Sequence, residues 1–339
     1  MEPPLRKSFF VHIMQVAQLA APRDQHVSQV VENKFLCREH YRLTLRLPFF
    51  PPTAPGQFVQ VACRDLQGAT TSELEMSWGE GETPSALAPE LMQSQAFLRR
   101  PFSLAGRTDT ADGVELSLIH RIVGVGTRWL SELKRGDRVD VLGPLGNRFR
   151  LPTAGETPIL VGGGVGIPPM LYLAEKLTGR NGVAFCGALS QDLLPLTIHP
   201  PQPPISPDAT DPLSNVEEFA RHGVAAVITT DDGSYGFRGF VTQALEQYLD
   251  RAKLPRPVIY TCGPEGMMKR VADIAGTRDI ECQVAVERAM ACGMGTCQSC
   301  CIRLKRDPAR DGQAFAGKDW IYKLACTDGP VFLGKDLLW

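Results

Sequence analysis

The sequence has almost no excess charge of either sign and no long hydrophobic run. Its 36 Lys and Arg residues are balanced by 37 Asp and Glu residues, which leaves a formal net charge of −1. A chain so balanced lacks the basic surface that attracts nucleic acids and anionic membranes. Its apolar runs, such as VAAVIT at 224–229, are far too short to span a bilayer. We therefore expect no nucleic-acid partner and no membrane association.

The sequence also shows little sign of a hydrolase active site or of an export signal. The six histidines are scattered, and no Ser-His-Asp or Cys-His order indicates a hydrolase, so no catalytic side chain of that kind is predicted. Residues 1–26 hold a mildly apolar segment that His12, Gln15 and Gln18 interrupt, which makes a poor export signal. We expect a cytoplasmic protein. Because the cytosol keeps thiols reduced, clustered cysteines indicate metal ligands before disulfides.

What is present is an ordinary globular composition spread over three regions. Hydrophobic residues make up 43% of the 339 residues, enough for more than one core. Residues 27–152 are β-rich, with alternation in HYRLTLRL (40–47) and a polar insertion at 64–98. Residues 153–280 alternate apolar strands with helical segments, which predicts a doubly wound parallel sheet. Residues 281–339 form a small tail rich in Cys and Gly, which a metal centre would help to fold.

The second region carries two turns at strand ends. The first contains four glycines between the strand PILV and a helix: Gly162, Gly163, Gly164 and Gly166. The backbone there can approach a pyrophosphate that the helix N-terminus attracts. The spacing is not G-x-G-x-x-G, and a tight turn that needs positive φ also explains glycine. The second turn is Cys262, Gly263 and Pro264, which would face the same crevice, although a lone cysteine is as often a small buried hydrophobe.

The first region carries a candidate anion site. Arg100 and Ser103 in RRPFSLAG offer a guanidinium fork and a hydroxyl for a phosphate. Arg121 lies on a strand some twenty residues later, and Gly126 and Thr127 enter a helix whose N-terminus is again suited to an anion. An arginine on a strand more often belongs to a solvated face. The two segments follow one another in the sequence and are followed by RGDRVDVLGPLGNRF. Together they indicate an anion site more specifically than either segment does alone.

The tail places four of the ten cysteines between residues 292 and 301. Three of them follow the C-x4-C-x2-C spacing of plant-type [2Fe–2S] sites, with a fourth after a longer gap. The predicted ligands are Cys292, Cys297, Cys300 and Cys326. Gly293 and Gly295 would let the loop wrap a cluster and aim amides at its sulfurs. Zinc, the main alternative, more typically uses C-x2-C pairs, and Cys301 is expected to point elsewhere.

Together these motifs resemble the ferredoxin–NADP⁺ reductase superfamily, whose members have a β-barrel flavin domain followed by a nucleotide domain. RPFS at 100–103 is similar to its flavin-phosphate motif, and GGGVGIPP and CGPEGMM are similar to its nicotinamide-nucleotide motifs. ACGMGTCQSC and ACTDGPVF at 325–332 are closely similar to the electron-transfer subunits of NAD-linked dihydroorotate dehydrogenases. The resemblance covers about residues 27–334. It implies an antiparallel FAD barrel (27–152), an α/β NAD domain (153–280) and a [2Fe–2S] domain (281–339).

The resemblance also implies site residues and a partner. FAD would contact Arg100, Pro101, Phe102, Ser103, Ile119, His120, Arg121, Gly126 and Thr127. NAD would contact Gly162, Gly163, Gly164, Gly166, Cys262, Gly263 and Pro264. The partner would be an FMN-containing catalytic subunit that oxidises dihydroorotate in pyrimidine biosynthesis, in a heterotetramer of two copies of each chain. Electrons would pass through the cluster and FAD to NAD⁺. NAD is expected over NADP because no arginine follows the strand GVAFCGAL to take a 2′-phosphate.

Two departures from the family pattern leave alternatives open. The insertion at 64–98 and the gap between Cys300 and Cys326 are both long. A fused plant-type ferredoxin domain would need a sizeable fold before Cys292, and only about thirty residues separate it from the CGP turn. The remaining alternatives are a related subunit of a hydrogenase, sulfide dehydrogenase or transhydrogenase complex, and a zinc-binding interaction module on a degenerate nucleotide fold.

Overall fold

Six antiparallel strands close into a barrel in the computed structural model of the chain, which describes residues 24–66, 96–200, 206, 208–307, 311 and 319–339. The strands are β1 (Asp24–Cys37), β2 (His40–Leu47), β3 (Phe58–Val61), β4 (Arg100–Thr110), β5 (Gly113–Arg121) and β6 (Arg138–Leu145). Their order around the barrel is β1-β2-β5-β4-β3-β6. The predicted strand 40–47 coincides with β2, whose Leu43, Leu45 and Leu47 point into the barrel core. Most of the predicted insertion lies outside the described residues.

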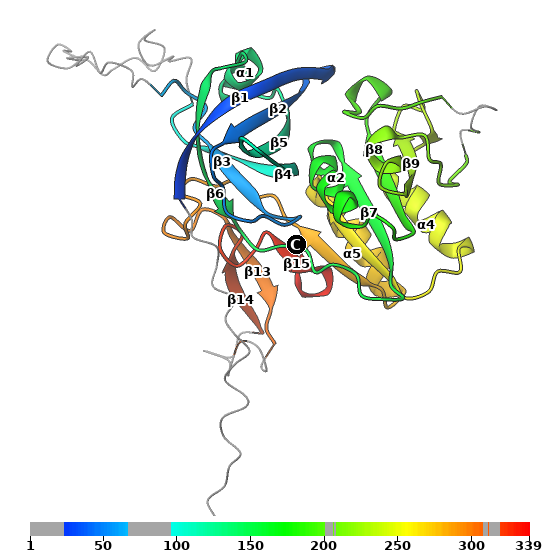
Figure 1. Ribbon diagram of the computed structural model, residues 1–339. Coiled ribbons are helices and arrows are strands. Elements are labelled where there is room, and N and C mark those ends of the chain that lie inside the picture. The colour runs from blue at the N-terminus through cyan, green and yellow to red at the C-terminus, as the bar shows by residue number, and fades with distance from the viewer. Residues whose placement is uncertain (1–23, 67–95, 201–205, 207, 308–310, 312–318) are drawn as a thin grey trace, which may run out of the picture.

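A seven-stranded sheet lies beside the barrel (Figure 1). Its strands are β7 (Thr157–Gly163), β8 (Gly182–Ala188), β9 (Val224–Thr230), β10 (Phe237–Arg238), β11 (Pro257–Cys262), β12 (Glu281–Ala285) and β15 (Val331–Leu333), in the order β10-β9-β8-β7-β11-β12-β15. All neighbours are parallel except β12 and β15. The doubly wound sheet predicted from the alternating pattern is therefore confirmed.

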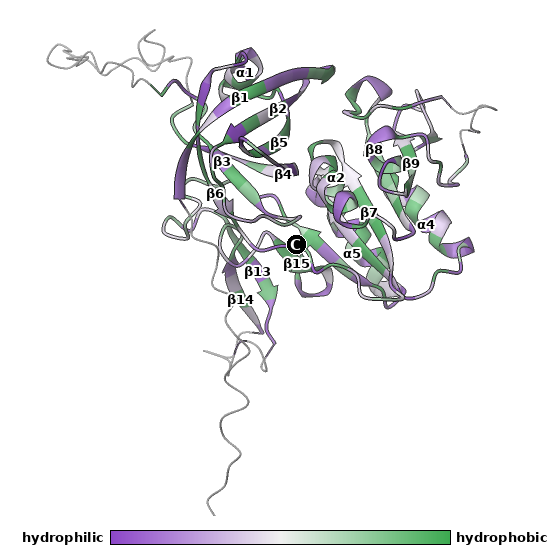
Figure 2. Cartoon of the chain, viewed as in Figure 1, coloured by the Kyte–Doolittle hydropathy of each residue, from purple (hydrophilic) through white to green (hydrophobic). Residues whose placement is uncertain are grey.

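Helices cover both faces of this sheet because successive side chains of its buried strands point to opposite sides. The helices are α2 (Ile167–Lys176), α3 (Glu217–Ala220), α4 (Val241–Arg251) and α5 (Glu265–Thr277). In β7, Ile159 and Val161 pack in one core with α4 and α5, whereas Leu160 packs in the other with α2 and α3. Figure 2 shows the hydrophobic residues concentrated in these strands.

The C-terminal region is divided between the sheet and a separate hairpin. β12 and β15 extend the seven-stranded sheet, so the tail predicted from residue 281 onward contributes two strands to the nucleotide fold. The hairpin of β13 (Cys301–Lys305) and β14 (Trp320–Leu324) stands outside that sheet and lies below the barrel in Figure 1. The loop that carries Cys292 and Cys297 connects β12 to this hairpin.

Polar contacts join the parts, among them those of Tyr172 and Asn147. Tyr172 of α2 is buried in the barrel core, and its hydroxyl lies 2.8 Å from the hydroxyl of Thr53. Asn147, just after β6, binds the segment that leads into β15: its Nδ2 donates to the carbonyls of Asp328 (2.9 Å) and Val331 (2.8 Å). Its Oδ1 accepts from the Val331 amide at 2.8 Å. The barrel is thus tied to both other parts.

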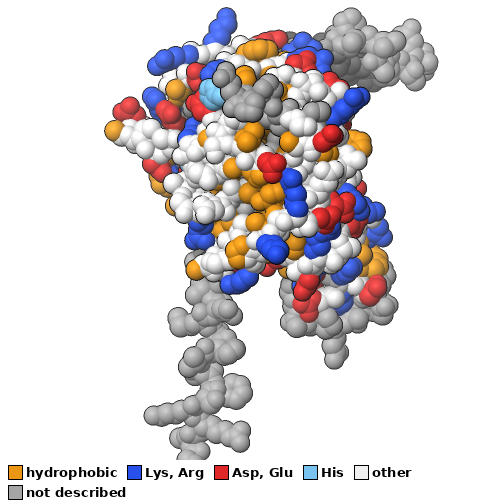
Figure 3. Space-filling view, turned by 90° about the vertical axis from the view of Figure 1, so that its right-hand side faces the viewer, with side chains coloured by type: hydrophobic (Ala, Val, Ile, Leu, Met, Phe, Trp, Pro, Cys, Tyr) orange, Lys and Arg blue, Asp and Glu red, His pale blue; other side chains and the backbone are white. Residues whose placement is uncertain are grey.

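The surface is mixed in charge. Seen from the side of the nucleotide domain, Lys and Arg side chains alternate with Asp and Glu around small hydrophobic groups (Figure 3). Within the described ranges, no helix is both long enough and apolar enough to cross a membrane.

Candidate redox site

The residues predicted to contact FAD come from three neighbouring elements of the barrel. Arg100, Pro101, Phe102 and Ser103 open β4 and pair with β3, while Ile119, His120 and Arg121 end β5. The rings of Phe102 and His120 lie 6.1 Å apart, edge to face. The Arg121 side chain forms an ion pair with Glu39 at 2.8 Å, and Arg100 donates to the Leu98 carbonyl at 3.2 Å. The structure therefore brings the two predicted segments together.

His120 is the unusual member of this group. It is only 2% exposed, and neither of its ring nitrogens has a hydrogen-bond partner among the described residues. Its ring stacks on Tyr41 with a centroid separation of 5.9 Å. Burial, helped by the nearby His40, lowers the pKa of His120 to about 4. The imidazole is therefore neutral at physiological pH, with one donor and one acceptor free for a ligand.

Gly126 and Thr127 lie at the start of helix α1 (Val125–Glu132), as predicted. The Thr127 hydroxyl accepts from the amide of Val123 at 2.9 Å and lies 3.2 Å from the amide of Gly124. A Cβ at Gly126 would lie 3.2 Å from the Cβ of Cys63, so glycine lets the helix approach the segment that follows β3. The pair fixes the entry to α1, and the first amides of that helix remain available to an anion.

The glycine-rich turn at 162–166 combines close packing with one open position. A Cβ at Gly166 would lie 2.1 Å from the Cys262 carbonyl oxygen, and one at Gly163 would lie 2.6 Å from Met267 Sδ. Gly164 differs, because it has φ +53 and, apart from its chain neighbours, no described residue comes within 4 Å of a built Cβ. Packing thus accounts for Gly163 and Gly166, whereas Gly164 offers exposed backbone at the N-terminal side of α2 for a phosphate.

The second predicted turn lies directly beside the first. Cys262 pairs with Gly162 across β11 and β7, and Gly263 and Pro264 follow at the same edge of the sheet. Burial, with the nearby Glu287 carboxylate adding to it, raises the pKa of Cys262 to about 12. The thiol is thus protonated and packs as a small hydrophobe at the edge where ligands of such sheets bind.

The four predicted iron ligands belong to one loop and one turn. Cys292 and Cys297 lie in the loop, where the amides of Met294 and Cys297 each donate to Cys292 Sγ at 3.4 Å. Cys300 ends the loop, and its carbonyl accepts from the amide of Ala325, the residue before Cys326. Gly293 and Gly295 have φ of +69 and +88, so both need glycine's freedom. Distant parts of the chain are therefore brought together as expected.

The thiols suit a metal cluster chemically. Hydrogen bonds from Ser299, with those from Cys292 adding to them, lower the pKa of Cys297 to about 6, which favours the thiolate that a metal binds. Burial beside Cys300 raises the pKa of Cys326 to about 12, a penalty that a bound cation reverses. Among the described side chains, no group of three or more His, Cys, Asp or Glu is arranged to hold a single metal ion. A [2Fe–2S] centre takes two thiolates on each iron, so it does not need three side chains that converge on one ion.

Cys301 differs from its neighbour Cys300. Cys300 is 2% exposed and packs in the core that Cys326 also joins. Cys301 opens β13, where it pairs with Leu324, and its side chain is partly exposed. Adjacent residues of a strand point to opposite sides, which agrees with the predicted separation of the two thiols.

The three candidate sites adjoin one another, and sequence reasoning missed the residues that connect them. β3 pairs with β4 on one side, and its Gln60 touches Gly293 of the cysteine loop. Asn147 holds the turn just after Cys326. The motif GPLGNRF contained Asn147, but only its long-range partners reveal what the side chain does.

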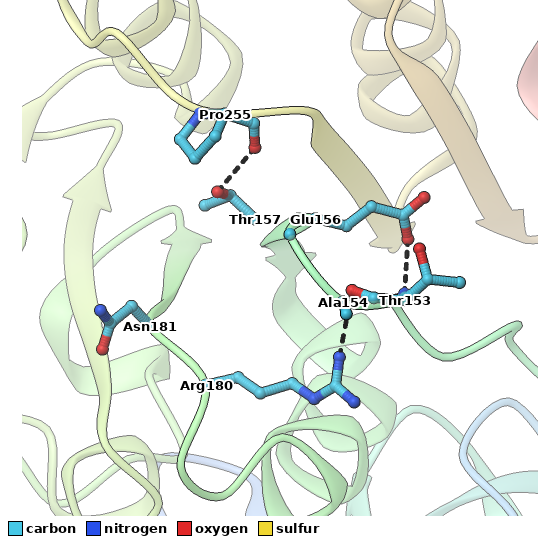
Figure 4. Close-up of a pocket in the computed structure, with 8 residues that line it drawn as sticks. Thr153, Ala154, Glu156, Thr157, Arg180, Asn181 and Pro255 are labelled. Atoms are coloured by element: carbon cyan, nitrogen blue, oxygen red, sulfur yellow. Dashed lines mark hydrogen bonds between the residues drawn. The ribbon is translucent and has the colours of Figure 1, made fainter.

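A cavity of about 390 Å³ lies elsewhere, at the edge of the sheet where the strands begin (Figure 4). Its polar groups bind one another: Arg180 donates to the Thr153 carbonyl at 3.3 Å, and Glu156 accepts from the Thr153 amide at 2.7 Å. Ligands of parallel sheets bind at the opposite, carboxyl edge, where Gly162 and Cys262 lie. This cavity is therefore not the candidate site.

Comparison with known proteins identifies relatives over most of the chain. Residues 287–338 match the family described as the iron–sulfur cluster binding domain of dihydroorotate dehydrogenase B. The electron transfer subunit of dihydroorotate dehydrogenase B (NAD(+)) from Desulforamulus reducens is 32% identical over 287 residues, covering 84% of this chain and 87% of that protein. Its counterpart from a Geobacillus species is 36% identical over 248 residues, covering 73% and 82%.

Solved structures share the fold. An NADH-dependent reduced ferredoxin-NADP oxidoreductase superposes with a TM-score of 0.65 at 24% identity, covering 92% of this chain and 90% of that one. A cytochrome P450 reductase from Amycolatopsis superposes with a TM-score of 0.53 at 24% identity, covering 76% and 67%. These likenesses confirm the predicted barrel and nucleotide fold.

Proposed function

The chain belongs to the family of electron transfer subunits of dihydroorotate dehydrogenase B (NAD(+)), and on that premise we propose that it links a dihydroorotate-oxidising partner to NAD⁺. When bound, FAD, a [2Fe–2S] cluster and NAD⁺ supply the redox chemistry, and the chain holds and spaces them. The observation that carries the proposal is the contact between the candidate sites. β4 pairs with β3, β3 touches the cysteine loop, and β5 contacts the glycine-rich turn.

In this proposal the barrel binds FAD through both of its segments. Arg100 and Ser103 hold phosphate oxygens, with Pro101 fixing the backbone between them and the start of α1 adding its amides. Phe102 and His120 supply a ring-lined wall, supported by their edge-to-face contact. His120 is neutral there, so it offers a directional hydrogen bond without adding charge.

The glycine-rich turn and the CGP turn form the proposed NAD site. Gly164 presents open backbone to the pyrophosphate, and Cys262 packs as a protonated thiol at the strand end. Asp231 and Asp232 follow β9, and their amides donate to the carbonyls of Ala188 and Leu189 at the end of β8. Carboxylates at this place suit ribose hydroxyls and repel a 2′-phosphate. Kinetics with NADH and NADPH test this, and a strong preference for NADPH would overturn it.

Cys292, Cys297, Cys300 and Cys326 are the proposed cluster ligands, and their reduced thiolates fit the cytoplasm as the compartment. The proposed partner is an FMN-containing catalytic subunit, assembled as two copies of each chain. The exposed side of the loop, at Cys297 and the 55% exposed Met294, leaves the cluster open toward such a partner.

Purification of the native complex under anaerobic conditions tests the proposal. We expect a brown preparation with a flavin-plus-cluster spectrum, NADH-dependent dye reduction by this chain, and a co-purifying flavoprotein that oxidises dihydroorotate. A colourless, zinc-loaded protein would support the interaction module instead. A coloured complex without dihydroorotate oxidation would assign the chain to another electron-transfer complex.

A further inference from the structure

Gln60 lies at the boundary between the barrel and the cysteine loop. It is on β3, where it pairs with Pro101 of β4 and Leu142 of β6. Its neighbours Val59 and Val61 point into the barrel core. Phe58, two residues away, packs instead in the core that contains Cys300 and Cys326. Because side chains alternate along a strand, Gln60 points outward with Phe58, toward the cysteines.

The Gln60 amide lies directly against the loop. A Cβ built at Gly293 would lie 2.7 Å from Gln60 Oε1, 2.8 Å from Cδ and 3.1 Å from Nε2. Gly293 follows Cys292, one of the proposed iron ligands, and precedes Met294, whose amide donates to Cys292 Sγ. The amide group of Gln60 is therefore packed against the backbone that shapes the sulfur environment of Cys292.

The same amide has no partner within the described part of the chain. Gln60 is 0% exposed, and neither Nε2 nor Oε1 makes a hydrogen bond there. A buried amide left unsatisfied costs about 1–3 kcal/mol, so native structures rarely keep one without a ligand or ordered water. The other glutamine that is buried among the described residues, Gln283, has both ends of its amide paired, with Arg150 and Glu281.

We propose that Gln60 is a positioning residue that donates a hydrogen bond from Nε2 to a sulfur of the bound [2Fe–2S] centre. The inference rests on the proposed function, because it requires the cluster. Thiolate and sulfide sulfurs are acceptors, and N–H groups directed at them favour the more negative, reduced state. Gln60 thus raises the reduction potential of the cluster at the side that faces the flavin strand β4.

Redox titration of the whole protein, followed by the visible and electron paramagnetic resonance signals of its two redox groups, tests this. Gln60→Met keeps the length of the side chain and removes the donor. We expect the redox equilibrium of the cluster to shift about tenfold toward the oxidised state, which lowers its reduction potential by about 59 mV for one electron. The potential of the flavin should not change. Gln60→Glu places a negative charge there, and its cluster potential is expected to fall below that of Gln60→Met.

Gln283→Met is the matched control, because it removes an equally buried amide that is satisfied within the sheet. It is expected to lower the thermal midpoint and leave both potentials unchanged. Loss of stability in the Gln60 variants with an unmoved cluster potential would reduce Gln60 to a packing residue and overturn the inference. A shift of the flavin couple alone would assign the donor to the flavin and also overturn it. Wild-type protein that contains no cluster would instead contradict the proposed function itself.

Discussion

The glycine-rich turn at 162–166 and the cysteine loop at 292–300 are both candidate cofactor sites, yet different forces hold them. The turn ends β7, between β8 and β11 in the middle of the sheet, and Gly162, Gly163 and Gly166 pack it against backbone and apolar side chains. The loop contains neither helix nor strand. It contacts the barrel through Gln60, and Asn147 is hydrogen-bonded to the turn that follows Cys326.

The difference shows how each site depends on the rest of the molecule. The turn belongs to one strand–turn–helix unit, so its shape follows from nearby residues and from close packing. The loop has no regular hydrogen-bond ladder of its own, so its shape depends on residues more than a hundred positions earlier and on whatever its thiols bind. Steric changes should therefore damage the turn, and loss of ligands or polar contacts should damage the loop.

The largest expected effect is loss of the cluster on Cys326→Ser. Removal of one of four thiolates leaves an iron short of a ligand, and we expect iron and acid-labile sulfide to fall to near zero. Cys301→Ser is the matched control, because Cys301 opens β13 and is partly exposed. It should keep full iron content. The reverse pattern would show that Cys301 is the ligand.

Gly166→Ala should break the turn by sterics alone. The new Cβ would lie 2.1 Å from the Cys262 carbonyl oxygen, and overpacking of this kind costs about 3 kcal/mol in urea unfolding. In Gly164→Ala the new Cβ meets no described residue beyond its chain neighbours within 4 Å, and the change costs only about 1 kcal/mol for the positive φ. It should instead weaken NADH binding. Equal stability losses in the two variants would contradict the division between packing and binding glycines.

Asn147→Ala should weaken the loop from a distance. It removes three side-chain hydrogen bonds to the segment after Cys326, worth about 1 kcal/mol each. We expect lower stability together with faster loss of iron to a chelator. Asn33→Ala is the control: it removes an amide whose Nδ2 donates its two hydrogens to three carbonyls at the end of α1, one of them shared. It should lower stability without changing iron release, and parallel iron loss in both variants would refute a specific role for Asn147.

The smallest expected effect is on the pH dependence of stability. It comes from the barrel that supports the loop, because the buried histidines His40 and His120 lie there. The folded pKa of His120 is about 4, below the value near 6.5 of an exposed histidine. The unfolded chain therefore binds more protons between these values, and stability falls as the pH drops from about 6.5 toward 4. His120→Phe should flatten this decline by about 2 kcal/mol. An unchanged slope in urea unfolding would exclude His120 as its source.

Much of the fold and site was predictable because the signals are local. Alternation predicted β2 at 40–47, and the apolar run PILV with its glycines predicted β7 and the following turn. Cysteine spacing singled out four candidate ligands, which lie in one loop and in a turn whose residue Ala325 is hydrogen-bonded to Cys300 at the end of that loop. The contributions of Gln60 and Asn147 were not predictable. Each is one polar residue in an apolar or turn context, and its partners lie about 180 to 230 positions away.

The sequence alone determined which residues are candidates for binding phosphate and iron, because chemistry and spacing within a few residues suffice to single them out. Only the tertiary structure decided that β12 and β15 complete the nucleotide sheet and that β3 lies between β4 and the cysteine loop. It also decided that Gly164, alone among the four glycines of its turn, is both left-handed and open to a ligand. These outcomes depend on which distant backbones pack together, and packing is a property of the folded chain as a whole.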